Sequence, residues 1–156
     1  ARGAGMTLSV TSDMIYAADD IDLGYPEIDV GVIPAIHYVH LPRQISRHKA
    51  FELLFVGKPI SAAEAASLGI INYAVPRAEL MDRAFAMALE FTAKSPTIMA
   101  LGRRSFMRAN DLDYRRNVEN QVETMCNIFS SADGQEGLAA FLEKRKPDYS
   151  PFPRYF

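Results

Sequence analysis

GYPEIDVGVIP, residues 24–34, places the carboxyl group of Glu27 in an apolar stretch punctuated by glycine and proline. In a sheltered apolar site the charged form of a carboxyl group is disfavoured, and its pKa rises toward neutrality. Such a group suits the removal and return of a proton near neutral pH, so Glu27 is a candidate acid/base. The alternative is an ordinary solvated loop acid.

Other short motifs stand in a fixed order around this segment. They are GAGMTL (3–8), SDMIYA (12–17), GVIP (31–34), SAAEA (61–65), LGII (68–71), DGQEG (133–137) and FLEKRK (141–146). Together with Pro26-Glu27 they resemble the enoyl-CoA hydratase/isomerase (crotonase) family over essentially all 156 residues. Several motifs in register are far more specific than any one alone.

The resemblance implies an α/β fold, a crotonase-like (ClpP/crotonase) spiral core fragment followed by a C-terminal helical oligomerisation region. The pattern of the sequence changes near Pro76, which divides the chain into residues 1–76 of the core and residues 77–156 of the helical region. Family members are longer at the N-terminus, and we expect this chain to be the C-terminal part of the fold. The missing N-terminal segment would supply the other oxyanion-hole amide, so residues 1–156 alone are expected to be catalytically incompetent.

Composition narrows the class of protein. A chain of 156 residues with 49% hydrophobic residues suits one folded unit. Seventeen Lys and Arg against 19 Asp and Glu give a formal charge of −2 without long blocks of one sign, which argues against nucleic-acid binding. The apolar runs are shorter than the roughly 20 residues that a membrane span needs. Cys126 is the sole cysteine, expected to be partly buried, and we expect a soluble, cytoplasmic protein.

Local patterns predict the elements. Short β-prone runs occur at 14–17 and 72–75, and the rest of the chain is predominantly helical. Glycines and caps delimit the helices. The predicted helices are 6–13, 47–56 ending at Gly57, a short one capped by Ser61 and Glu64 and closed by Gly69, 78–94, one starting at Pro96 after the N-cap Ser95, 112–129 and 135–146.

Gly3-Ala4-Gly5 precedes a helical run, so its amides point out of a helix N-terminus, where an anion is favoured. The resemblance implies that the amide of Ala4 donates to a thioester oxygen and stabilises the enolate formed when a proton leaves the adjacent carbon. The alternative is an ordinary helix-entry turn.

Thr7 departs from the family pattern. Hydratases of the family carry a glutamate at this position, and threonine cannot act as a base on water. A site with Glu27 alone resembles the enoyl-CoA isomerases, in which one glutamate moves a proton from C2 to C4. Double-bond isomerisation therefore fits best. Hydration, another crotonase-type lyase or hydrolase reaction, and a non-catalytic scaffold stay open as alternatives.

A second departure follows the Ile-Pro pair, where the small glycines of hydratases are replaced by bulkier residues. His37 and His40 lie three residues apart, hence on one face of a helix, within reach of the turn that carries Glu27. Either could assist proton transfer or orient Glu27; each could instead be a solvent or interface histidine. Two histidines and a distant acid do not make a metal site, so none is expected.

The C-terminal region supplies the predicted partners. The resemblance implies that Phe141 and Lys144 contact the CoA nucleotide, with a ring on adenine and an ammonium on a phosphate. A basic turn that complements the helix dipole is the alternative. CoA would be part of the substrate, with no separate cofactor. The apolar residues of the late helices are core or, as we expect, an interface of a homo-oligomer, a trimer or a dimer of trimers.

Overall fold

The computed structural model describes residues 1–110 and 113–149. The first part of the chain contains, in order, α1 (Ala4–Val10), β1 (Tyr16–Ala18), β2 (Asp22–Leu23), the 3-10 helix η1 (Pro26–Val30), α2 (Ala35–Gln44), α3 (Arg47–Val56), β3 (Ile60–Ser61), α4 (Ala62–Leu68) and β4 (Tyr73–Val75). The second part contains the 3-10 helix η2 (Arg77–Glu79), α5 (Leu80–Thr92), α6 (Pro96–Asn110), α7 (Tyr114–Phe129) and α8 (Ala132–Leu142). The predicted change from mixed to helical structure near Pro76 is confirmed.

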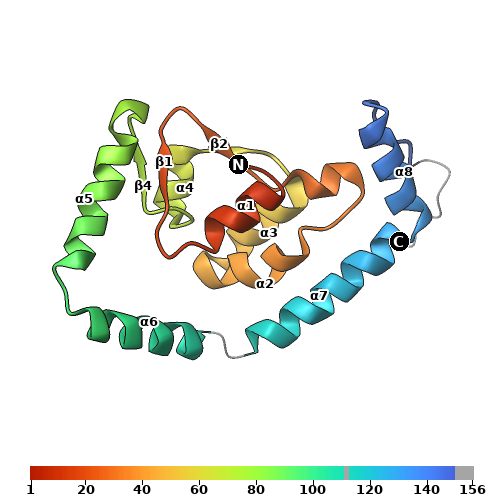
Figure 1. Cartoon of the computed structure of the whole chain (residues 1–156). Helices are drawn as coiled ribbons and strands as arrows, with labels where there is room; N and C mark the ends of the chain where they lie inside the picture. Colours follow the sequence, from red (N-terminus) through yellow and green to blue (C-terminus); the bar gives the residue numbers. More distant parts are fainter. Residues whose placement is uncertain (111–112, 150–156) are drawn as a thin grey trace.

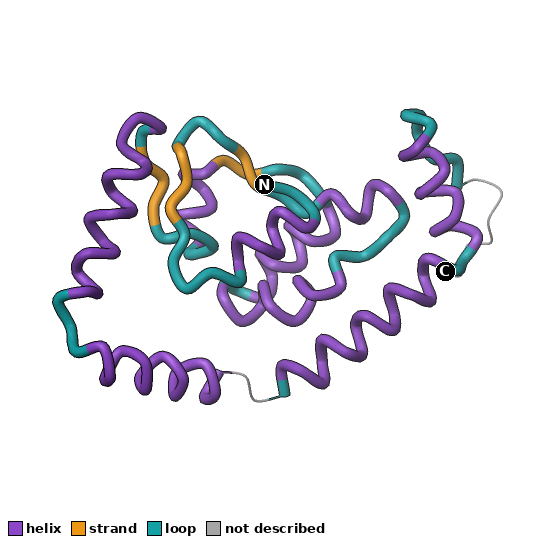
Figure 2. Tube along the Cα trace, in the orientation of Figure 1, coloured by secondary structure: helices purple, strands orange, loops and turns teal. Residues whose placement is uncertain are grey.

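Two short strand pairs hold the first part together (Figure 2). β1 runs parallel to β4, with Tyr16 opposite Tyr73 and Ala18 opposite Val75. β2 runs antiparallel to β3, with Leu23 opposite the buried Ile60. Both β-prone runs of the sequence therefore form strands, and they form one pair with each other.

Caps set the helix ends where the sequence predicts them. Gly57 and Gly69 take φ angles of 71° and 81° and end α3 and α4. The hydroxyl of Ser61 accepts a hydrogen bond of 3.1 Å from the amide of Glu64, as an N-cap does. Ser95 accepts in the same way from the amide of Ile98, at 3.4 Å.

The hydrophobic core lies between α1, α2, α3, α4 and the two strand pairs. Ala50, Leu53 and Leu54 form the buried face of α3. Burying such side chains is the main favourable term in folding. The core residues with the least exposure are Met6, Leu23, Tyr25, Leu41, Ala50, Leu54, Ala62, Ala65 and Ile70.

The later helices form an arc around this core (Figure 1). α5 packs on β1, α7 runs along α2, and α8 turns back onto η1. α6 joins α5 to α7 and exposes large apolar side chains, among them Ile98 at 67% and Phe106 at 66%. The arc therefore brings α8 back to η1, the segment that carries Glu27.

Three details correct the predictions. α1 spans Ala4–Val10 instead of 6–13, because Gly3 turns the chain at a φ angle of 53° and the hydroxyl of Thr11 closes the helix on the carbonyl of Leu8. α8 spans Ala132–Leu142 instead of 135–146. Cys126 is exposed, not partly buried. The first residue of the predicted helix 112–129 lies outside the described residues.

Candidate active site

Glu27 lies on η1, a short helix fixed at both ends. Pro26 opens it, and Gly31 ends it in the left-handed conformation, with a φ angle of 75°. The side chain of Glu27 is half-buried, and its Oε2 atom is buried without a hydrogen-bond partner among the described residues. Burial raises the pKa of Glu27, against a smaller opposing effect of its own backbone amide. The predicted sheltered carboxyl group is confirmed.

The charge of Glu27 affects the pKa of two tyrosines. Burial and, after it, the charge of Glu27 raise the pKa of both Tyr25 and Tyr38. Their hydroxyl oxygens are buried and make no hydrogen bond with a described residue. Both phenols therefore stay neutral near pH 7, and their protons are free to be donated.

His37 lies on α2 and is buried, with 2% of its surface exposed. Its Nε2 atom lies 3.1 Å from the hydroxyl of Thr7, and its ring centroid lies 4.6 Å from that of Tyr25. Burial, with a contribution from His40, lowers the pKa of His37 to about 4. The imidazole is neutral at physiological pH, and the alternative of a solvent histidine is wrong for His37.

His40 shares a face of α2 with His37, as predicted, but its contacts lead elsewhere. Its ring meets that of Tyr114 edge-on at 6.2 Å, and its Nε2 atom lies 3.4 Å from Nε2 of Gln44. Burial and the charge of Arg43 lower its pKa. The structure therefore joins His40 to α7 and joins His37 to Thr7 and Tyr25.

Unsatisfied polar atoms concentrate in this part of the molecule. Within the described ranges, five buried side-chain N or O atoms make no hydrogen bond, and all belong to η1, α2 or the residue before η1. Buried polar groups in native proteins are nearly always paired, so this concentration makes the segment a candidate functional site. The atoms are Tyr25 Oη, Glu27 Oε2, His37 Nδ1, Tyr38 Oη and His40 Nδ1.

The other predicted site residues lie at two helix ends. Ala4 is the first residue of α1 and is exposed. Phe141 is 64% exposed in the last turn of α8, the helix that packs on η1. Lys144 lies beyond the end of α8, not on the helix as predicted, and takes a positive φ angle of 55°. The roles of these three residues stay predictions.

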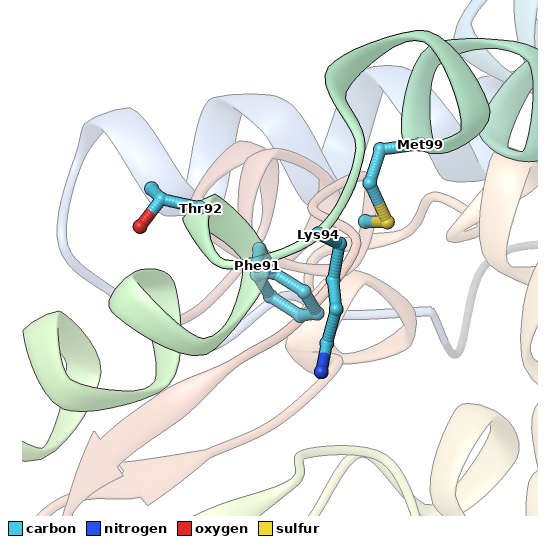
Figure 3. Close-up of a pocket in the computed structure, with 4 residues that line it drawn as sticks. All are labelled: Phe91, Thr92, Lys94 and Met99. Carbon is cyan, nitrogen blue, oxygen red and sulfur yellow. The ribbon is translucent and has the colours of Figure 1, made fainter.

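A hollow of about 340 Å³ elsewhere in the molecule has a different character. Phe91, Thr92 and Lys94 line it from the end of α5 and the connection after it, and Met99 lines it from α6 (Figure 3). It contains no acid and none of the residues of η1 or α2, so it is not the site that the polar cluster defines.

The described ranges place no group of three or more His, Cys, Asp or Glu side chains where they could hold a metal ion. Across the same ranges, no helix combines the length and the apolar character needed to cross a membrane.

Comparison with known proteins identifies the class. The sequence profile of the family described as enoyl-CoA hydratase/isomerase matches residues 1–151. A probable enoyl-CoA hydratase of Bacillus subtilis (strain 168) is 36% identical over 151 residues, covering 96% of this chain and 58% of that protein. The human enoyl-CoA hydratase domain-containing protein 3, mitochondrial, is 34% identical over 153 residues, covering 98% of this chain and 50% of that protein.

Solved structures agree. The carnitinyl-CoA hydratase from Mycobacterium avium superposes with a TM-score of 0.86 at 29% identity, covering 97% of this chain and 59% of that one. The enoyl-CoA hydratase/isomerase from Pseudoalteromonas atlantica T6c gives a TM-score of 0.87 at 25% identity, covering 96% and 61%. The chain belongs to the enoyl-CoA hydratase/isomerase family and has a crotonase-like α/β fold. It spans about half to three fifths of the length of these relatives.

The sequence predicted Glu27 and singled out Thr7, His37 and His40 as possible auxiliary residues, but it missed two tyrosines. The contact between Thr7 and His37 was not predicted. Tyr25 and Tyr38 stand beside Glu27 and His37 in the sequence, and their proximity to those residues was the signal available.

Proposed function

We propose that the protein acts on an enoyl-CoA thioester and moves its double bond, with Glu27 as the acid/base. The carboxylate removes a proton from C2, the negative charge passes to the thioester oxygen, and the carboxylic acid returns the proton to C4. The amide of Ala4 is one donor to that oxygen. A donor of this kind contributes roughly 3–4 kcal/mol to lowering the barrier.

The observation that carries the proposal is the state of Glu27. Its Oε2 atom is buried without a hydrogen-bond partner in the part of the chain that the structure describes, and burial raises its pKa. A carboxyl group tied in an ion pair would have a lowered pKa and would be a poor proton carrier. Glu27 instead has the raised pKa that suits a base that removes a proton from carbon.

Thr7 favours isomerisation over hydration. Its hydroxyl is engaged with His37 and supplies no carboxylate to activate water. Hydration is the second candidate, because relatives such as the Bacillus subtilis protein are named hydratases. Other crotonase-type lyase or hydrolase reactions and a non-catalytic scaffold are the remaining alternatives, since one enolate-stabilising fold hosts many reactions.

The partners follow from the same proposal. Phe141 and Lys144 would contact the CoA nucleotide, with no cofactor beyond the CoA of the substrate. The exposed apolar side chains of α5 and α6 support a homo-oligomer, a trimer or a dimer of trimers. A cytoplasmic location stays a prediction, since the human relative is named mitochondrial.

Residues 1–156 by themselves are proposed to be inactive. The oxyanion hole needs two donors, of which only Ala4 is predicted within these residues. Loss of one donor lowers the rate roughly 100- to 1,000-fold. In a protein as long as these relatives, the additional residues would supply the second donor and the rest of the CoA site.

The test compares two reactions in the natural polypeptide. A 3-enoyl-CoA should be converted to the 2-enoyl-CoA faster than the 2-enoyl-CoA is hydrated, and Glu27→Gln should slow the conversion by roughly 100-fold or more. Asp29→Asn, an equal change at an exposed carboxylate of the same helix, is the control. Hydration as the faster reaction would favour the second candidate, and no reaction with either substrate would favour the scaffold.

A further inference from the structure

Helix α1 carries Ala4, the proposed donor to the thioester oxygen, and its start is tied to the segment before η1. The amide of Gly24 donates a hydrogen bond of 3.1 Å to the carbonyl of Ala1. The guanidinium group of Arg2 lies 2.9 Å from the carboxylate of Asp22, and both side chains are exposed. Exposed ion pairs contribute little to stability. Contacts at one end also leave the direction of a helix free, so a second contact is needed to fix α1.

His37 supplies that second contact from within the core. Its Nε2 atom lies 3.1 Å from the hydroxyl oxygen of Thr7, three residues after Ala4 on α1. Its ring packs on that of Tyr25, the residue before η1, with 4.6 Å between the centroids. His37 and Tyr25 are each 2% exposed. One buried imidazole therefore contacts both α1 and the start of η1.

The bond of Thr7 differs from those that other hydroxyl groups of this segment make. Ser9 and Thr11 donate to backbone carbonyls of their own segment, each at 2.8 Å, which is the usual choice of Ser and Thr in helices. Thr7 instead bonds to a residue 30 positions further along the chain. The two places where the sequence departs from the hydratase pattern, Thr7 and the segment of His37, are therefore in contact with each other.

The imidazole is the donor in this contact. Burial, with a contribution from His40, lowers the pKa of His37 to about 4, so the ring is neutral near pH 7 and carries one N–H group. Its Nδ1 atom is buried without a partner among the described residues. A buried N–H without an acceptor is rare in native proteins. The proton therefore belongs on Nε2, which donates to the hydroxyl oxygen of Thr7.

We propose that His37 is a positioning residue, which holds the helix of the oxyanion donor Ala4 in a fixed place relative to the helix of the base Glu27. The two groups act on neighbouring atoms of the substrate, the thioester oxygen and C2, so their separation must be constant. A misplacement of about 1 Å can lower a rate about 100-fold. His37 acts through Thr7 on one side and Tyr25 on the other. This inference rests on the proposed function and adds the residue that aligns its two catalytic groups.

The test measures exchange of the C2 protons of butanoyl-CoA in deuterium oxide, catalysed by the natural polypeptide at several substrate concentrations. His37→Phe retains a ring beside Tyr25 but has no Nε2 atom. We expect its kcat for exchange to fall roughly 10- to 100-fold while KM stays within about twofold, because binding of the CoA portion does not depend on this alignment. Thr7→Val removes the other partner of the same bond and should have a similar effect. The double variant should then be no slower than the slower single variant, since both changes remove one interaction.

A matched pair of variants distinguishes positioning from a merely structural role. The amide nitrogen of His37→Gln can take the place of Nε2, so this variant should recover most of the lost kcat. His37→Asn has the same amide on a side chain one methylene shorter, which cannot reach Thr7, and should recover little. His48→Phe, at an exposed histidine, is the control and should leave kcat unchanged. A merely structural role would lower the free energy of unfolding in all three His37 variants and leave kcat of the folded protein unchanged.

Three results would overturn this inference alone, provided that the unsubstituted protein catalyses exchange. They are full kcat in folded His37→Phe and Thr7→Val, a loss confined to KM, and losses that add in the double variant. If His37→Phe does not fold, Thr7→Val and the Gln and Asn variants decide. Absence of exchange by the unsubstituted protein would overturn the proposed function and this inference with it.

Discussion

Gly137 of α8 lies directly against Gly31 at the end of η1. A Cβ atom at position 137 would clash with the carbonyl of Val30 and would lie 2.8 Å from the Cα of Gly31. The backbones of the two segments can approach this closely only because neither residue has a side chain. The last described helix therefore braces the segment that carries Glu27.

Gly137→Ala should separate α8 from η1. Overpacking of this kind costs roughly 1–3 kcal/mol, and the displacement should lower turnover as well as the free energy of unfolding. Gly102→Ala is the matched control, since a Cβ there meets nothing within 4 Å. In an exposed helix interior that change should be neutral or stabilising by up to about 1 kcal/mol. Urea denaturation of both variants checks this, and equal midpoints would show that the contact does not brace η1.

Thr7→Glu should raise hydration relative to isomerisation of the same enoyl-CoA, because it restores a carboxylate where hydratases of the family have one. Thr7→Gln, which has the same size without the charge, should leave the ratio unchanged. Both rates are measured by chromatography of the acyl-CoA products. A folded Thr7→Glu variant with an unchanged ratio would assign the choice of reaction to the segment 37–40 instead.

His37 should make the protein less stable in mild acid. Its pKa is 6.5 ordinarily and about 4 in the folded protein, so the unfolded state binds more protons between these values. The free energy of unfolding should therefore fall as the pH falls from about 6.5 toward 4, by about 3 kcal/mol at most for this group. His37→Phe should remove this part of the pH dependence and His48→Phe should not, as thermal denaturation across this range can show. Parallel curves for the protein and its His37→Phe variant would contradict the buried, neutral state of His37.

Local signals predicted the elements well. Gly57, Gly69, Ser61 and Ser95 each act through neighbours a few residues away, so the sequence contains all the information that sets those helix ends. The end of α8 was missed for the opposite reason. Lys144 takes the left-handed conformation usually given to glycine, and the amide of Arg145 bonds the carbonyl of Ala140 at 3.0 Å. Arg145 then folds back to Glu136, with Nη2 2.9 Å from Oε2.

The candidate site also contains features that local sequence predicts and features that it does not. The sheltered position of Glu27 follows from the apolar residues next to it in the sequence, and the family motifs identify it independently. The contact of Thr7 with His37 depends on how α1 packs on α2, which no local pattern specifies. For the same reason, the five unpaired polar atoms could not be predicted from the sequence, since their burial is a property of the tertiary structure.

The most direct test of the account is exchange of the C2 protons of butanoyl-CoA with deuterium oxide, catalysed by the natural polypeptide. This reaction needs only a base and stabilisation of the enolate, so it measures Glu27 without assuming which product forms. We predict exchange well above the uncatalysed rate, reduced roughly 100-fold or more by Glu27→Gln and little changed by Asp29→Asn. Absence of exchange, or exchange that Glu27→Gln leaves intact, would contradict the assignment of Glu27 as the base.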